Sequence, residues 1–137
     1  MTSLPQEELM MTTIKKVIQN TMVDSEFHIH LGNFLDEFYR ATRQKKQNML
    51  VDSPLSHAKE VNREFIAYVA ATTHKLANDY NLEIPPWVFE KECYLGGDKP
   101  YFAGNVKGDL RLIFLYLSPP EFKHRNLFVD ENALQRV

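Results

Sequence analysis

Five histidines are the residues of this 137-residue chain whose type most often serves in metal binding or proton transfer. His28 and His30 lie two positions apart, which on a helix separates their directions by about 200°, so they cannot hold one ion together. His57, His74 and His124 lack the H-x-x-x-H or H-E-x-x-H spacing of helical metal sites. The sequence therefore predicts no metal site and favours structural roles for all five histidines.

The single cysteine and the acidic pairs also fail to form a catalytic set. Cys93 is flanked by Glu90 and Glu92, and nearby negative charge raises the pKa of a thiol, so a buried and inert cysteine is favoured. Asp36 and Glu37 are adjacent and point to different faces of a helix. The glycines lack the strand-to-helix context and the lysine of phosphate-binding loops. We assign no catalytic or cofactor-binding residue and expect no cofactor; a non-enzyme is favoured, although the question stays open.

Positive charge is densest in one polar stretch, which contains Arg40, Arg43, Lys45 and Lys46. Such a cluster can contact phosphates along a nucleic-acid backbone. It also suits the C-terminal end of a helix, where cations interact favourably with the helix dipole, and we favour this second interpretation. Lys123 and Arg125 would support an anion site if the fold brought them near the cluster. Nucleic-acid binding is kept as the alternative function.

Composition predicts one folded domain. Apolar residues make up 44% of the chain and charged residues 25%, close to the averages of globular proteins, and the formal net charge of −2 supplies no strong overall field. One cysteine rules out an intrachain disulfide and predicts a reducing compartment, the cytoplasm. The N-terminus does not resemble a signal peptide, and the longest apolar run, residues 112–117, is far shorter than a membrane span. We expect no membrane association.

Apolar residues at helical spacing predict three long helices, over residues 5–22, 24–38 and 53–80. The third begins with serine as N-cap and proline at its first position, and Asn81 is suited to a left-handed end. Gly32 weakens the second helix but permits a close crossing.

Prolines and glycines divide the last third of the chain. We expect a short helix within residues 86–93 and a turn at 96–100. Residues 110–117 fit either a buried strand or a buried helix, and we favour a helix capped by Asp109. Residues 118–121, Ser-Pro-Pro-Glu, predict another helix start. The fold class is therefore all-α: an antiparallel three-helix bundle over 1–82, with a proline- and aromatic-rich extension of short helices and turns over 83–137 packed on it as part of the same domain.

The extension mixes aromatic and polar residues that suit either a structural role, which we favour, or recognition of a partner. The candidate interaction residues are Trp87, Tyr101, Phe102, Phe122, Lys123, Arg125 and Asn126.

One pattern in the extension has a counterpart elsewhere. It consists of Pro85-Pro86-Trp87, Pro100-Tyr101-Phe102, Ser118-Pro119-Pro120-x-Phe122-Lys123-x-Arg125-Asn126-x-Phe128-Val129 and Leu134-x-Arg136-Val137. This pattern resembles the C-terminal region of small uncharacterised bacterial proteins and covers about the last 50 residues. The resemblance implies a bacterial origin and supplies no activity, substrate or cofactor.

By elimination, the sequence predicts a non-enzymatic protein-binding or regulatory module, antitoxin-like in type, with an unidentified protein partner and self-association as a further option. The first alternative is a nucleic-acid-binding regulator that uses the basic cluster at 40–46. The second is an enzyme or small-ligand carrier with a pocket between bundle and extension.

Overall fold

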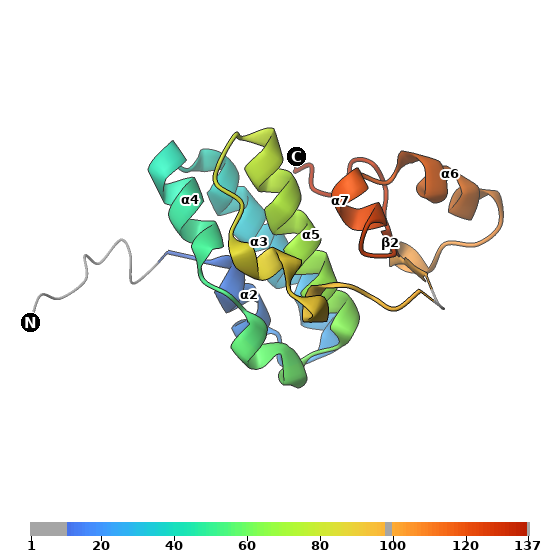
Figure 1. Cartoon of the computed structure of the whole chain (residues 1–137), viewed down its shortest axis with the longest axis horizontal. Helices are drawn as coiled ribbons and strands as arrows, with labels where there is room; N and C mark the ends of the chain where they lie inside the picture. Colours follow the sequence, from blue (N-terminus) through green and yellow to red (C-terminus); the bar gives the residue numbers. More distant parts are fainter. Residues whose placement is uncertain (1–10, 98–99, 137) are drawn as a thin grey trace, which may run out of the picture.

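The computed structural model describes residues 11–97 and 100–136 and is predominantly helical (Figure 1). Its α-helices are α2 Ile14–Asn20, α3 Phe27–Arg40, α4 Arg43–Val51, α5 Arg63–Asp79, α6 Asp109–Leu117 and α7 Pro120–Lys123. Its 3-10 helices are η1 Asp24–Glu26, η2 Leu55–Glu60, η3 Pro86–Phe89, η4 Lys91–Cys93 and η5 Ala103–Asn105. Two strands, β1 Tyr101–Phe102 and β2 Leu127–Phe128, form a small parallel sheet with Tyr101 opposite Leu127. The helical character is confirmed, and the sheet is an element that the sequence did not indicate.

Helix α5 is the central element. Every residue from Phe65 to Thr73 is buried, so the middle of this helix is covered on all sides, as expected of an interior helix. Helix α2 and η2 pack against it, and so do η3, η4 and α7 from the later part of the chain. Small residues such as Ala67, Ala70 and Ala71 allow these neighbours to approach closely. Both halves of the chain are thereby positioned by one helix.

Helix α3 buries the apolar stripe that its spacing predicted. The buried side chains are Phe27, Leu31, Phe34, Leu35 and Phe38. The ring of Phe27 stacks on Phe65 of α5 with a centroid distance of 4.2 Å and meets Tyr68 edge to face at 5.6 Å. These contacts join α3 to the central helix.

One helix was not expected, and one expected helix boundary is wrong. The polar run after α3 forms a separate helix, because Ala41 and Thr42 are extended and the Thr42 hydroxyl accepts a hydrogen bond from the Lys45 amide (3.3 Å), which starts α4. The helix expected from residue 53 is also interrupted: η2 is followed by extended Val61 and Asn62, and α5 begins only at Arg63. Asn62 donates instead to Asp24 Oδ2 (2.7 Å), a contact that sequence spacing cannot reveal.

The three-helix bundle is not confirmed in the form expected. Residues 5–10 of the first predicted helix lie outside the described residues, and the helix that follows spans only Ile14–Asn20. The end of the third helix is confirmed, since α5 stops at Asp79 and Asn81 has a positive φ of 53°. The expected short helix at 86–93 is present as two 3-10 turns, η3 and η4.

Residues 100–130 form what we call the C-terminal lobe, which projects to one side of the helical body in Figure 1. The Leu95 amide donates to the Arg125 carbonyl (3.2 Å) and the Tyr101 amide to the Asn126 carbonyl (3.1 Å), which ties the incoming chain to the end of α7. Pro120 occupies the first turn of α7 as expected. Ser118 does not cap that helix; its hydroxyl lies within hydrogen-bond distance of the Phe114 and Val129 carbonyls and accepts from the Val129 amide.

Gly32 offers a test of how the chain end packs on α3. A Cβ built at this position would approach the Arg136 guanidinium to 3.0 Å, and Arg136 is an exposed, flexible side chain paired with Asp36 (2.9 Å). Because this neighbour can move, Gly32→Ala should raise the free energy of unfolding by about 0.5–1 kcal/mol through helix propensity. Urea denaturation measures the change. A clear loss of stability would show that the chain end is fixed tightly against α3.

Candidate functional site

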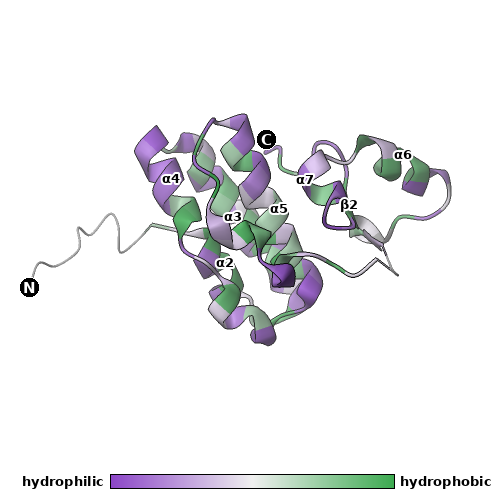
Figure 2. Cartoon of the chain, in the orientation of Figure 1, coloured by the Kyte–Doolittle hydropathy of each residue, from purple (hydrophilic) through white to green (hydrophobic). Residues whose placement is uncertain are grey.

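Helix α6 carries the largest group of exposed apolar side chains on a single described helix. Their exposed fractions are 45% for Leu110, 55% for Leu112, 49% for Ile113, 40% for Leu115, 79% for Tyr116 and 48% for Leu117. Phe114 is the only buried residue of the helix. A run this apolar was expected to be buried, and that expectation is wrong: Figure 2 shows α6 as a strongly hydrophobic element at the edge of the molecule. Contiguous exposed apolar surface of this kind marks interaction sites.

The lobe holds α6 by its inner face and its ends. Phe114 is buried, and the Ser118 hydroxyl within reach of the Phe114 and Val129 carbonyls joins the end of α6 to the chain after α7. At the start of the helix, Gly108 has a φ of 61° and is the N-cap residue, so Asp109 is the first helical residue and not the cap that was expected. The outward faces of α6 are left without contacts that would bury them.

Positive charge borders the apolar surface of α6. The Arg111 guanidinium lies 4.8 Å from the centre of the Phe102 ring, and its Nε donates to the Val106 carbonyl (3.0 Å). Lys123 Nζ donates to the Tyr116 carbonyl at the end of the helix (2.6 Å). Lys107 is exposed just before α6, and Asp109 is the acidic residue of its first turn. The rim therefore carries three cations and one carboxylate.

The predicted interaction residues lie mostly inside the fold. Trp87 is 7% exposed and donates from Nε1 to the Leu50 carbonyl (3.2 Å), while Phe122 is fully buried and meets Tyr68 edge to face. Tyr101 and Phe102 are half-buried in β1, where Phe102 stacks on Phe128 at 5.1 Å. These contacts favour the structural interpretation of the aromatic residues.

Arg125 is the most unusual of the predicted residues, because its side chain is 1% exposed and forms no ion pair with any carboxylate in the described residues. Its Nη2 donates to the Val88 carbonyl and its Nη1 to the Glu121 carbonyl, both at 2.8 Å. The guanidinium also lies 4.7 Å from the Tyr94 ring centre. Burial is the largest influence on its pKa, which is lowered from its ordinary value. Carbonyl oxygens and an aromatic face thus take the place of a counter-ion.

His74 completes the surroundings of Arg125. Its Nδ1 lies 3.3 Å from Arg125 Nη1, so a neutral imidazole can accept a hydrogen bond there. Burial lowers the pKa of His74, and the positive charge of Arg125 lowers it further. Asn126, the neighbouring predicted residue, has a φ of 61° and donates from its side chain to the Gly96 carbonyl (2.9 Å). Both residues serve the attachment of the lobe.

The basic cluster is occupied by internal contacts. Arg43 donates to the Tyr80 and Asn81 carbonyls, and Lys45 pairs with Glu37 at 3.4 Å. Lys46 is buried, where its Nζ donates to the Ala41 carbonyl (2.6 Å) and lies over the Phe38 and Tyr80 rings. Arg40 donates to the Asp36 carbonyl. The interpretation as helix C-terminal charge holds only for Arg40, because Arg43, Lys45 and Lys46 lie in the first half of α4.

Cys93 is buried, as expected. Its pKa is raised to about 12, first by burial and further by Glu92 and Glu90, although Arg125 opposes the shift. His28 lies edge to face with Phe27 and Tyr68, and burial lowers its pKa. Over residues 11–97 and 100–136, no group of three or more His, Cys, Asp or Glu side chains is placed to hold a metal ion.

In the described part of the chain, each helix is too short or too polar to cross a bilayer. Comparison of the chain with protein-family models, with curated proteins and with solved structures gives no match. The resemblance of the C-terminal pattern to small bacterial proteins therefore stays a prediction.

Sequence reasoning missed α6 as the candidate interaction surface. The signal was present in Leu110–Leu117, but a continuous apolar run is equally typical of a buried segment. Only the placement of α6 at the edge of the lobe separates the two interpretations.

Replacing Arg125 tests its structural role. In Arg125→Met the Val88 and Glu121 carbonyls lose their guanidinium donors, and we expect the free energy of unfolding to fall by about 2–4 kcal/mol. The matched control is Arg40→Met, an exposed arginine with one contact to a carbonyl of its own helix, for which a change within about 0.5 kcal/mol is expected. Equal effects in urea denaturation would contradict the assignment.

The environment of His74 predicts acid sensitivity. Its pKa is below the 6.5 of the unfolded chain, so the unfolded state binds the proton first as pH falls. Its contribution to stability is present above pH 6.5 and is lost as the pH drops from there toward the folded-state pKa. Urea denaturation at pH 7 and pH 5 should show a smaller acid loss in His74→Gln than in wild type, because a glutamine oxygen accepts from Arg125 without titrating. An identical loss would exclude His74 as a contributor.

Proposed function

We propose that this protein is a non-enzymatic binding module that inserts α6 into an apolar groove of a protein partner. The observation that carries the proposal is the exposure of apolar side chains around most of α6, in a lobe that is otherwise held by buried contacts. The proposal retains residues 1–82 as a helical body and 83–137 as the segment that packs on it, supported by the contacts of η3, η4 and α7 with α5.

The distribution of these side chains favours a groove over a flat surface. With Phe114 facing inward, Leu112 and Tyr116 point to the opposite side, and Ile113 and Leu115 lie about 100° to either side of Phe114. A flat partner covers one side of a helix, whereas a groove covers the outer side and both flanks. Insertion of an amphipathic or apolar helix into such a groove is a recurrent mode of protein recognition.

A second copy of the chain is a less suitable partner for the exposed apolar surface of α6. Stable interfaces bury roughly 1,200–2,000 Å² in total, and two nine-residue helices laid side by side cover only one face of each other. If two copies paired in parallel, the cations Lys107, Arg111 and Lys123 of one copy would also repel the same cations of the other. We infer a partner whose groove has an acidic rim.

A regulatory, antitoxin-like role follows from this mode of binding, because a helix that fills a groove excludes other ligands from it. A cytoplasmic location is part of the proposal and is supported by the single cysteine, which is buried as a free thiol. Nucleic-acid binding is not favoured, because each cation of the 40–46 cluster already has an internal contact.

Capture from a lysate of the source organism, after nuclease treatment and at high salt, tests the proposal with three baits. They are the wild type, Leu112→Glu/Tyr116→Glu in α6, and a control that places two glutamates at exposed apolar positions elsewhere, Met22→Glu/Ile29→Glu. A stoichiometric protein should be retained by wild type and control and lost by the α6 variant, at least about tenfold in affinity for two removed anchors. In the purified complex, amides 110–117 should gain protection from hydrogen exchange.

Two results would contradict the groove proposal. In one, the α6 variant and the control retain the same proteins, which would make α6 irrelevant to binding. In the other, the purified wild type sediments as a dimer that the α6 variant converts to a monomer, which would assign the surface to a second copy of the chain.

A further inference from the structure

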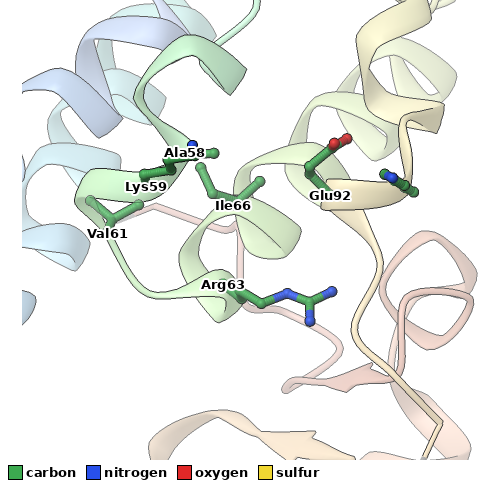
Figure 3. A pocket seen from close by; sticks show the side chains of 7 residues that line it. Ala58, Lys59, Val61, Arg63, Ile66 and Glu92 are labelled. Atoms are coloured by element: carbon green, nitrogen blue, oxygen red, sulfur yellow. The ribbon is translucent and has the colours of Figure 1, made fainter.

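A cavity of about 520 Å³ lies between the helical body and the segment that follows it, away from α6. Its lining residues come from η2 and the residue after it, from the first turn of α5, and from η4, as Figure 3 shows. Its volume falls within the roughly 300–1,000 Å³ of small-molecule sites. Residues 58–66 and the later residues 91–92 thus border one open cavity.

The floor of the cavity is apolar. Ala58 and Val61 line it from the η2 side, and Ile66 lines it from α5, where its side chain is almost fully buried. An apolar floor gains free energy when a hydrocarbon group displaces water from it. Inorganic anions have no such group and cannot use this part of the site.

The rim of the cavity is cationic. Lys59, Arg63 and Lys91 line it together with one carboxylate, Glu92. Lys59 and Lys91 are exposed and form no ion pair with the described residues. Arg63 donates from Nη2 to the Tyr94 carbonyl (3.0 Å), and its Nε and Nη1 have no acceptor in the described part of the chain. Donors for an anion are therefore present in excess on a chain whose net charge is −2.

The start of α5 adds to this positive field. Arg63 is the first residue of that helix, and its N-cap residue Asn62 makes no side-chain capping bond because it donates to Asp24 instead. The N-terminal end of a helix carries a partial positive charge. Glu64 in the same turn opposes this field, but it is not among the residues that line the cavity.

A second cavity has a lining whose polar side chains are more fully occupied by contacts within the chain. It is lined by Arg43, Gln47 and Glu83 among others, and these groups bind within the chain. Arg43 donates to the Asn81 carbonyl (2.6 Å), and Gln47 exchanges two hydrogen bonds with the Glu83 backbone (3.0 and 2.8 Å). No comparable internal contacts hold Lys59 and Lys91 in the described residues.

We propose that the cavity between η2, α5 and η4 binds a small amphiphilic carboxylate, with its hydrocarbon part on Ala58, Val61 and Ile66 and its charge near Lys59, Arg63 and Lys91. This site is independent of α6, so it adds a ligand to the binding module and does not depend on the protein partner. The ligand class is a monocarboxylate with a medium-length aliphatic or an aromatic body.

The test titrates octanoate, below the concentration at which it aggregates, into the purified full chain and follows amide resonances by NMR. Octylamine reverses the charge of the probe, octanol removes it, and acetate removes the hydrocarbon body. We expect saturable shifts at residues 58–66 and 91–92 with octanoate, and affinities at least about fivefold weaker for each of the other probes.

Two variants locate the charge. Lys91→Glu should weaken octanoate binding at least about fivefold, whereas Arg40→Glu makes the same charge change at an exposed cation of α3, outside both proposed sites, and should leave binding unchanged. Ala58→Phe should reduce binding by filling the floor, with thermal unfolding confirming that the variant folds. The proposal is overturned if octanoate and octylamine bind equally, if acetate alone reproduces the shifts, or if the Lys91 and Arg40 variants bind octanoate alike.

Discussion

The burial of one guanidinium is the constraint on which the arrangement of the chain depends. Arg125 sits at the end of α7 with almost no exposed surface, and its donors reach carbonyls of α7 and η3 while its Nη1 lies beside His74 of α5. A buried cation without hydrogen-bond partners is strongly unfavourable. The positions of α7, η3 and α5 are therefore coupled, because displacement of any one of them removes a partner from a buried charge whose Nε already has none in the described residues.

This coupling determines which residues remain for function. Aromatic residues of the extension pack on the helical body, where Trp87 donates to the Leu50 carbonyl and Phe122 meets Tyr68, so both are interior residues. Helix α6, which precedes α7, is held through Phe114 and Ser118, and its outer side is exposed. The two proposed sites thus lie on different segments: one is an apolar helix at the edge of the lobe, and the other is a cavity beside the start of α5.

Helix periodicity and capping preferences identified several elements from the sequence. They succeeded where the contacts that determine the element are close together in the chain. The stripe from Phe27 to Phe38, the left-handed Asn81 and the first turn at Pro120 are all encoded within a few residues. Helix α4 was not predicted, and the break before α5 was missed because it depends on extended residues and on contacts such as that of Asn62 with Asp24, 38 positions away.

The candidate sites were less accessible to sequence reasoning. Whether the apolar residues of α6 face the core or solvent depends on tertiary packing. Hydrophobic periodicity in the sequence does not report on that packing. The cavity unites Lys59 with Lys91 across a whole helix, and no spacing rule relates them. A pocket between body and extension was named as an alternative, but its residues could not be.

The position of Cys93 has a practical consequence. It is the single thiol of the chain, it is fully buried, and its Sγ lies 3.3 Å from the Trp87 carbonyl, directly behind the attachment of the lobe. An alkylating reagent can reach it only when η3 and η4 separate from α5, so its rate of modification reports how often that separation occurs. The same inertness leaves the native surface free of competing thiols, so a cysteine introduced on α6 can carry a fluorophore selectively.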